Sequence, residues 1–246
     1  MSHEVPKKPD DNAFANILLN VVLPVLSLSY LSEEGGKPWH IGPTYALVLA
    51  LALPIGYGVW HFAKTRKLNV FSLIGLGSVL LTGGLTLYLW NEDGTVKDNA
   101  ALLFGLKEGS IPLILGLTVL ISHWTKAPLL RVFLYSDSIF DVRKIEKVVK
   151  EKGAEDGYGK VLFNSTVLFA ASFLISAVAN VFLALHFLTG VTDKVAYNSA
   201  VAKLTGYGFL VIGLPILIFL GICLWRLLGG LQRVTGLEKE ELMQAR

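Results

Sequence analysis

The chain has 246 residues, of which 22 are lysine or arginine and 19 are aspartate or glutamate, giving a formal net charge of +3. Charged residues make up only 17% of the chain and the mean hydropathy is +0.56, whereas a soluble domain carries about 25% charged residues. These values argue against a disordered chain, a basic nucleic-acid-binding protein and an ordinary soluble enzyme, and they indicate an integral membrane protein. The single cysteine, Cys223, excludes an internal disulfide framework and a multi-cysteine metal site.

Six apolar stretches are long enough, or nearly so, to cross the ~30 Å hydrocarbon core of a bilayer as helices of about 20 residues. In chain order they are Ala13–Leu31, Ile41–Ala63, Val70–Trp90, Leu103–Thr125, Val161–Leu188 and Leu204–Leu228. The sequence therefore predicts an all-α, polytopic membrane helix bundle with six transmembrane helices. Residues 13–228 form the transmembrane domain, and residues 1–12 and 229–246 form the N-terminal and C-terminal tails.

Lysine and arginine are unevenly distributed between the predicted loops. With six spans and the N-terminus inside, 17 of the 22 fall in inner segments and 5 in outer segments. By the positive-inside rule, both termini are then cytoplasmic. The first span could instead be read as a signal peptide with Ser27-Leu28-Ser29 as its cleavage site. We favour a span, because removing it would leave an odd number of crossings.

The longest inner loop, residues 126–160, contains the pattern of a basic amphipathic helix. Ser138 and Asp141 predict a start resembling a capping box, and Gly153 predicts the end. Apolar residues recur at helical spacing, and four cations lie between them: Arg143, Lys144, Lys147 and Lys150. These cations are candidate contacts for anionic lipid headgroups at the inner leaflet or for a partner. The alternative, which we favour, is a connector whose apolar face packs on the bundle. A second short helix is expected at Leu237–Gln244, capped by Thr235 and Glu238.

Polar side chains within the spans are the candidates for an intramembrane site, because burying them in lipid is costly. Five residues form this candidate polar site: Asn16 and Asn20 in the first span, Lys107 and Glu108 in the fourth, and Asn180 in the fifth. Lys107 and Glu108 lie near the outer end of their span, where snorkelling to the interface is the simpler interpretation. For Asn180 and the hydroxyl row Ser78, Thr82 and Thr86, helix packing is the simpler interpretation.

Four spans contain proline, at Pro24, Pro54, Pro112 and Pro215. Transporters use broken helices to expose backbone groups to a substrate, although membrane helices tolerate proline in general. Proline together with the polar residues leaves open a second function, a small-solute transporter or channel with its site among these helices.

Motifs of soluble enzymes are missing from the sequence. It has no phosphate-binding loop of the Walker type and no dinucleotide-binding fingerprint with its acidic partner. No two histidines have metal-ligand spacing, and Cys223 has no activating base in its sequence neighbourhood. We therefore expect no enzymatic activity, no catalytic residues, no cofactor, no bound metal and no nucleic-acid partner.

Several short runs line up in order along the chain. They are Arg66-Lys67-Leu68, Gly83-Gly84-Leu85-Thr86-Leu87, Asn91-Glu92-Asp93, Ser122-His123-Trp124, Lys126-Ala127-Pro128-Leu129-Leu130-Arg131 and Ala179-Asn180-Val181. Together they resemble the intracellular septation protein A family of bacterial inner-membrane proteins, or an uncharacterised branch related to it. The chain departs from the family pattern at His123, where glutamine is usual, in a longer inner loop, and in extended tails.

This resemblance implies a multi-pass protein of the bacterial inner membrane with a non-enzymatic role in cell-envelope maintenance or division. It implies no catalytic residues and no cofactor. Its expected partners are membrane lipids, a second copy of the chain or another envelope protein.

Overall fold

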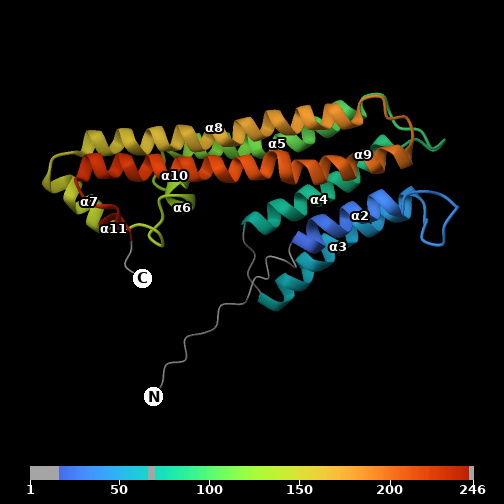
Figure 1. Ribbon diagram of the computed structural model, residues 1–246, viewed down its shortest axis with the longest axis horizontal. Helices are drawn as coiled ribbons and strands as arrows, with labels where there is room; N and C mark the ends of the chain where they lie inside the picture. Colours follow the sequence, from blue (N-terminus) through green and yellow to red (C-terminus); the bar gives the residue numbers. More distant parts are fainter. Residues whose placement is uncertain (1–16, 66–69, 244–246) are drawn as a thin grey trace, which may run out of the picture. The chain divides into compact units, whose positions relative to one another are not determined.

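The computed structural model describes residues 17–65 and 70–243, and these residues are almost entirely helical (Figure 1). The predicted all-α class is confirmed for this part of the chain. In chain order the elements are η1 Leu18–Val22, α2 Leu23–Tyr30, α3 Pro43–Thr65, α4 Val70–Leu89, α5 Ala100–Ser122, α6 Leu129–Phe133, α7 Val142–Glu151, α8 Glu155–Leu188, α9 Lys194–Tyr207, η2 Gly208–Gly213, α10 Leu214–Thr235 and α11 Lys239–Leu242.

Among the described residues, four helices are long and apolar enough to cross a membrane: Pro43–Lys64, Ala100–Ser122, Glu155–Leu188 and Lys194–Thr235. Two shorter apolar helices, Leu18–Tyr30 and Gly75–Leu89, lie within two further predicted spans. The last two long helices have 34 and 42 residues, which is about 51 and 63 Å at 1.5 Å per residue. They extend well past the spans predicted at Val161–Leu188 and Leu204–Leu228.

Each long helix carries one stretch in which large apolar side chains are exposed. These stretches are Tyr45–Phe62 in α3, Leu102–Ile121 in α5, Phe163–Phe182 in α8 and Tyr207–Trp225 across α9, η2 and α10. Each is about 20 residues long, so each matches the ~30 Å thickness of the hydrocarbon core. The residues of α8 before Phe163 and of α10 after Trp225 lie outside these stretches.

The predicted proline interruptions do not break the helices. Two π-helical segments, η1 and η2, end just before Pro24 and Pro215, whereas Pro54 and Pro112 lie inside α3 and α5. Proline lacks an N–H and clashes with the carbonyl of the preceding turn, and a locally wider turn is one way in which a helix accommodates such a defect.

The chain divides into two compact units, Met1–Lys107 with Phe182–Phe209, and Glu108–Val181 with Leu210–Arg246. In the first unit, two turns that the sequence predicts on the outer side, at 90–99 and 189–193, are linked. The Val96 N–H donates to the Thr192 carbonyl at 2.8 Å, and Thr95 forms a β-bridge with Asp193. A core that includes Leu89, Phe104, Leu188 and Tyr197 lies against these turns.

In the second unit, the long inner loop and the C-terminal segment fold together. We call residues 126–160 and 226–243 the inner cap, after their predicted side. The Asp141 N–H donates to the Leu242 carbonyl at 2.9 Å, and Phe140 forms a β-bridge with Met243. The core of the cap consists of fully buried side chains: Tyr135, Phe140, Ile145, Leu231 and Leu242.

Two details of the cap differ from the sequence prediction. Ser138 does not start the amphipathic helix, because its hydroxyl bonds to that of Ser136 at 2.7 Å. Asp141 is the N-cap of α7 and accepts from the Lys144 N–H at 3.1 Å. The C-terminal helix α11 is shorter than expected and is capped by Glu238, whereas the Thr235 hydroxyl donates to the Leu231 carbonyl. Residue 244, the predicted end of that helix, lies outside the described residues.

Candidate functional site

The five residues of the candidate intramembrane site belong to different parts of the chain's two units. Asn16 lies outside the described residues, and Asn20 is exposed on η1 in the first unit. Lys107 belongs to the first unit, whereas Glu108 and Asn180 belong to the second. Asn180 donates to the Ser176 carbonyl at 2.8 Å, one turn back on its own helix.

Lys107 makes a polar contact between two helices of the first unit. Its Nζ donates to the Thr82 hydroxyl on α4 at 2.6 Å, and Thr82 donates to the Ser78 carbonyl at 2.8 Å. One turn further along α4, the Thr86 hydroxyl lies 3.4 Å from the Tyr197 hydroxyl on α9. The hydroxyl row of α4 therefore links neighbouring helices, as polar side chains do in membrane bundles.

A buried polar cluster around Asn198 was missed by sequence reasoning. Asn198 is fully buried and donates to the Pro43 carbonyl at 2.9 Å and to the Ser32 hydroxyl at 3.0 Å. Ser32 donates in turn to the Leu28 carbonyl at 2.7 Å. The cluster ties the start of α9 to the end of α2 and the start of α3. Its only sequence signal is an asparagine in a segment that hydropathy assigns to a loop.

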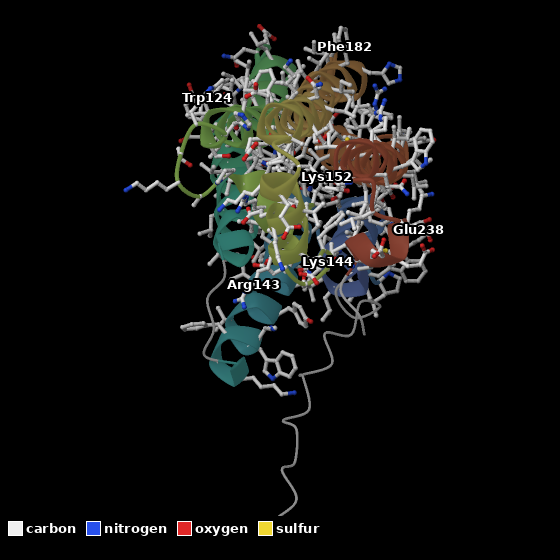
Figure 2. All side chains as sticks on the ribbon, turned by 90° about the vertical axis from the view of Figure 1, so that its left-hand side faces the viewer. Trp124, Arg143, Lys144, Lys152, Phe182 and Glu238 are labelled. Atoms are coloured by element: carbon white, nitrogen blue, oxygen red, sulfur yellow. The ribbon has the colours of Figure 1, made fainter. Side chains whose placement is uncertain are left out.

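The basic face of α7 is the most clearly defined charged surface in the second unit. Arg143, Lys147 and Lys150 are exposed, and Lys144 is half-buried. Lys144 pairs with Glu241 of α11 at 3.1 Å, and Lys147 lies 3.8 Å from Glu151. Figure 2 shows Arg143 and Lys144 on α7, with Glu238 on the C-terminal segment. Within residues 17–65 and 70–243, the side chains of Arg143 and Lys150 contact no acidic group.

The opposite face of α7 is apolar and is already covered by protein. Val142, Ile145 and Val149 are buried in the core of the cap, and α7 contacts α10 and α11. A helix that lies in a membrane interface buries its apolar face in lipid. In this structure the cap buries that face against α10 and α11 instead. Arg143, Lys147 and Lys150 remain exposed on the other face of α7.

A tyrosine pair and an ion pair connect α7 and α8 with α6 and the residues that follow it. The Tyr158 hydroxyl donates to that of Tyr135 at 3.2 Å, and Arg131 pairs with Glu146 of α7 at 2.7 Å. Burial raises the pKa of Tyr135, so its phenol stays neutral at physiological pH. The basic face of α7 is thus presented on a fixed support.

Groups that could hold a metal or a small ligand are few in the described part of the chain. No cluster of three or more histidine, cysteine, aspartate or glutamate side chains is found there. A pocket of about 270 Å³ at the start of α3 is lined by residues that include Glu34, His40 and Tyr45. Both ring nitrogens of His40 already have partners in this pocket, because Nε2 lies 3.4 Å from Glu33 and Nδ1 contacts the Gly35 carbonyl.

No protein-family model, curated protein or solved structure matches this chain. The fold of residues 17–65 and 70–243 therefore defines the class: it is all-helical, and four of its helices are long and apolar enough to cross a membrane. The resemblance to the septation protein A family stays a prediction from the sequence.

Proposed function

We propose that the chain crosses the membrane six times and that both termini are cytoplasmic. Two sets of contacts support this topology. In the first unit, the predicted outer turns at 90–99 and 189–193 pair with each other. In the second unit, the predicted inner loop pairs with the C-terminal segment. Loops assigned to one side by the alternation of spans are thus found together within each unit.

We further propose that the protein is a non-enzymatic factor of the bacterial inner membrane that contributes to envelope maintenance or division. This role rests on the sequence resemblance and on the membrane-length helices. A solute carrier would require polar groups that converge on a water-filled path. Lys107 instead links α5 to α4 through Thr82, and Asn180 is hydrogen-bonded to Ser176 within its own helix, so we do not adopt the carrier alternative.

Within this role, the working surface is the basic face of α7, and its ligand is an acidic cytoplasmic protein. The observation that carries the proposal is that α7 exposes Arg143, Lys147 and Lys150 while its apolar face is fixed in the cap. The exposed apolar stretch of α8 starts at Phe163, about 12 Å along the helix axis from the start of α8 at Glu155. Because α7 precedes Glu155 in the chain, it lies outside that apolar stretch. Carboxylates bind such cations through charge-assisted hydrogen bonds.

A photoreactive amino acid at position 147 of the full-length protein, in the cells that produce it, tests the proposal. We expect adducts with protein, and we expect Arg143→Gln with Lys150→Gln to reduce their yield by about two- to tenfold, the effect of removing two exposed charges. The control places the same photoreactive residue at Lys203, which is exposed on α9, and should give no adduct sensitive to those two changes. Adducts with lipid alone, or a yield unaffected by the two substitutions, would contradict the proposal.

A further inference from the structure

Three aromatic rings meet where α5 ends and α8 enters its exposed apolar stretch, both within the second unit. The ring centroids of Trp124 and Phe163 are 6.1 Å apart, and the His123 ring lies 5.1 Å from Phe163 and 5.5 Å from Trp124. Trp124 is 69% exposed and Phe163 is 38% exposed. Two large rings are therefore presented to the surroundings at the end of an apolar stretch, the position that aromatic residues favour at a membrane interface.

The cluster is held in place by its polar neighbour. The His123 Nδ1 lies 3.4 Å from the Thr166 hydroxyl, and Thr166 donates to the Leu162 carbonyl at 2.9 Å. His123 thus connects the end of α5 with the body of α8. This contact holds Trp124, which follows His123, near Phe163, which lies on the same helix as Thr166.

Two lysines lie close to the rings in sequence, one in each segment. Lys126 follows Trp124 by two residues, and Lys160 precedes Phe163 by three residues, which is nearly one helical turn. Both are exposed, and their ammonium groups contact no acidic side chain in the described part of the chain. Two cations of this kind beside interfacial aromatic rings match the headgroup of an anionic lipid.

Apolar side chains continue from the rings along the same two helices. Ile114, Leu117 and Ile121 are exposed on one face of α5, and Val167 and Leu174 are exposed on α8. The two helices pack closely, since a Cβ at Gly116 would lie 3.0 Å from Phe173 Cβ and 3.1 Å from the Ala170 carbonyl oxygen. This pair of helices offers acyl chains an apolar surface that begins at the charged end.

We propose that these residues form a binding site for one anionic phospholipid. Lys126 and Lys160 bind its phosphate, and Trp124 and Phe163 contact the glycerol region. The acyl chains follow α5 and α8. The long lysine stems let each ammonium group reach the phosphate level while the methylenes stay against apolar surface. The site is separate from the basic face of α7, which the proposed function assigns to a protein partner.

Native mass spectrometry of the full-length protein tests this site, with the protein purified from nanodiscs that contain equal amounts of phosphatidylglycerol and phosphatidylcholine. We expect the protein to retain phosphatidylglycerol preferentially, and Lys126→Gln with Lys160→Gln to reduce that retention about tenfold. Trp124→Ala should weaken it as well. The matched control, Arg143→Gln with Lys147→Gln, removes the same charge from α7 and should leave retention unchanged.

Three outcomes would overturn the site: no preference for phosphatidylglycerol, equal retention by the Lys126 and Lys160 variant, or an equal loss in the α7 control. In the last case the cations of α7 would themselves bind lipid, and the photoreactive residue at position 147 would report it separately as lipid adducts. All of the substituted lysines and arginines are exposed, so the variants should unfold at the same temperature as the parent protein.

Discussion

At the residue scale, Asn198 fixes three helices through one amide group. It donates to the Pro43 carbonyl and the Ser32 hydroxyl from a fully buried position. Asn198→Ala should lower the free energy of unfolding by about 1–3 kcal/mol, because it leaves a buried carbonyl without its donor. Thermal unfolding of the purified protein in detergent measures this loss.

The control for this change is Asn91→Ala, which removes a hydrogen bond to Thr95 in an exposed turn. Asn91→Ala should lower the free energy of unfolding by well under half as much as Asn198→Ala does. Equal losses for the two variants would contradict the role assigned to the buried amide.

Glu241 gives the cap a dependence on pH. The Glu238 N–H and the Lys144 ammonium group lower the pKa of Glu241 below its ordinary value of 4.5. A carboxylate whose pKa is lower in the folded state contributes stability above the unfolded pKa and loses it as the pH falls through the folded pKa. Docking of α11 on α7 should therefore be complete above pH 4.5 and weaken progressively below it.

Hydrogen exchange of the Asp141 amide, which donates to the Leu242 carbonyl, measures this docking. Its protection in the parent protein should fall below pH 4.5, relative to a Glu241→Gln variant measured at the same pH. Glu240→Gln serves as the control, because Glu240 is exposed on the same short helix. It should keep the dependence on pH of the parent. An identical pH profile for the parent and Glu241→Gln would refute the assignment.

At the element scale, the packing of α5 on α8 depends on glycine. A Cβ at Gly109 would lie 2.7 Å from Val181 Cγ2 and 3.0 Å from the Ala177 carbonyl oxygen. Gly109→Ala should therefore destabilise the protein by about 1–3 kcal/mol through overpacking. Gly221→Ala on α10, where a Cβ would meet nothing within 4 Å, is the matched control and should be neutral or slightly stabilising. Thermal unfolding measures the stability of both variants. Similar shifts in the unfolding temperature of Gly109→Ala and Gly221→Ala would count against close packing at Gly109.

The sequence predicts these elements better than it predicts their ends. Hydropathy identifies long apolar helices, because a run of about 20 apolar residues has few other uses. It places the start of the fifth span at Val161 and of the sixth at Leu204, whereas the helices begin at Glu155 and Lys194. The first turns of α8 pack in the inner cap, where Tyr158 contacts Tyr135, and those of α9 pack in the first unit, where Tyr197 and Asn198 are buried. A hydropathy scan does not detect such packing.

For the candidate sites too, the sequence predicts local patterns but not contacts between distant segments. Helical periodicity predicts which residues of α7 are apolar, and Ile145 and Val149 are indeed buried. The partner of Lys144 is Glu241, 97 residues further along the chain, and that distance hides it from any local pattern. The Asn198 cluster and the ring cluster at Trp124 likewise join segments that are far apart in sequence.

At the scale of the whole molecule, the proposed six-span topology requires the loops to alternate between the two sides of a membrane. The contacts between the turns at 90–99 and 189–193, and between the inner loop and the C-terminal segment, are those that this alternation would produce. The basic face of α7 and the lipid site at Lys126 and Lys160 both depend on the inner cap being cytoplasmic.

Cysteine accessibility tests this requirement most directly. In a Cys223→Ala background, single cysteines replace exposed residues in the full-length protein: Asp98 and Thr189 in predicted outer turns, and Asp137 and Lys239 in the inner cap. In intact spheroplasts, a membrane-impermeant maleimide should label positions 98 and 189, and should label 137 and 239 only after permeabilisation. Labelling at 137 before permeabilisation, or protection at 98, would contradict the topology.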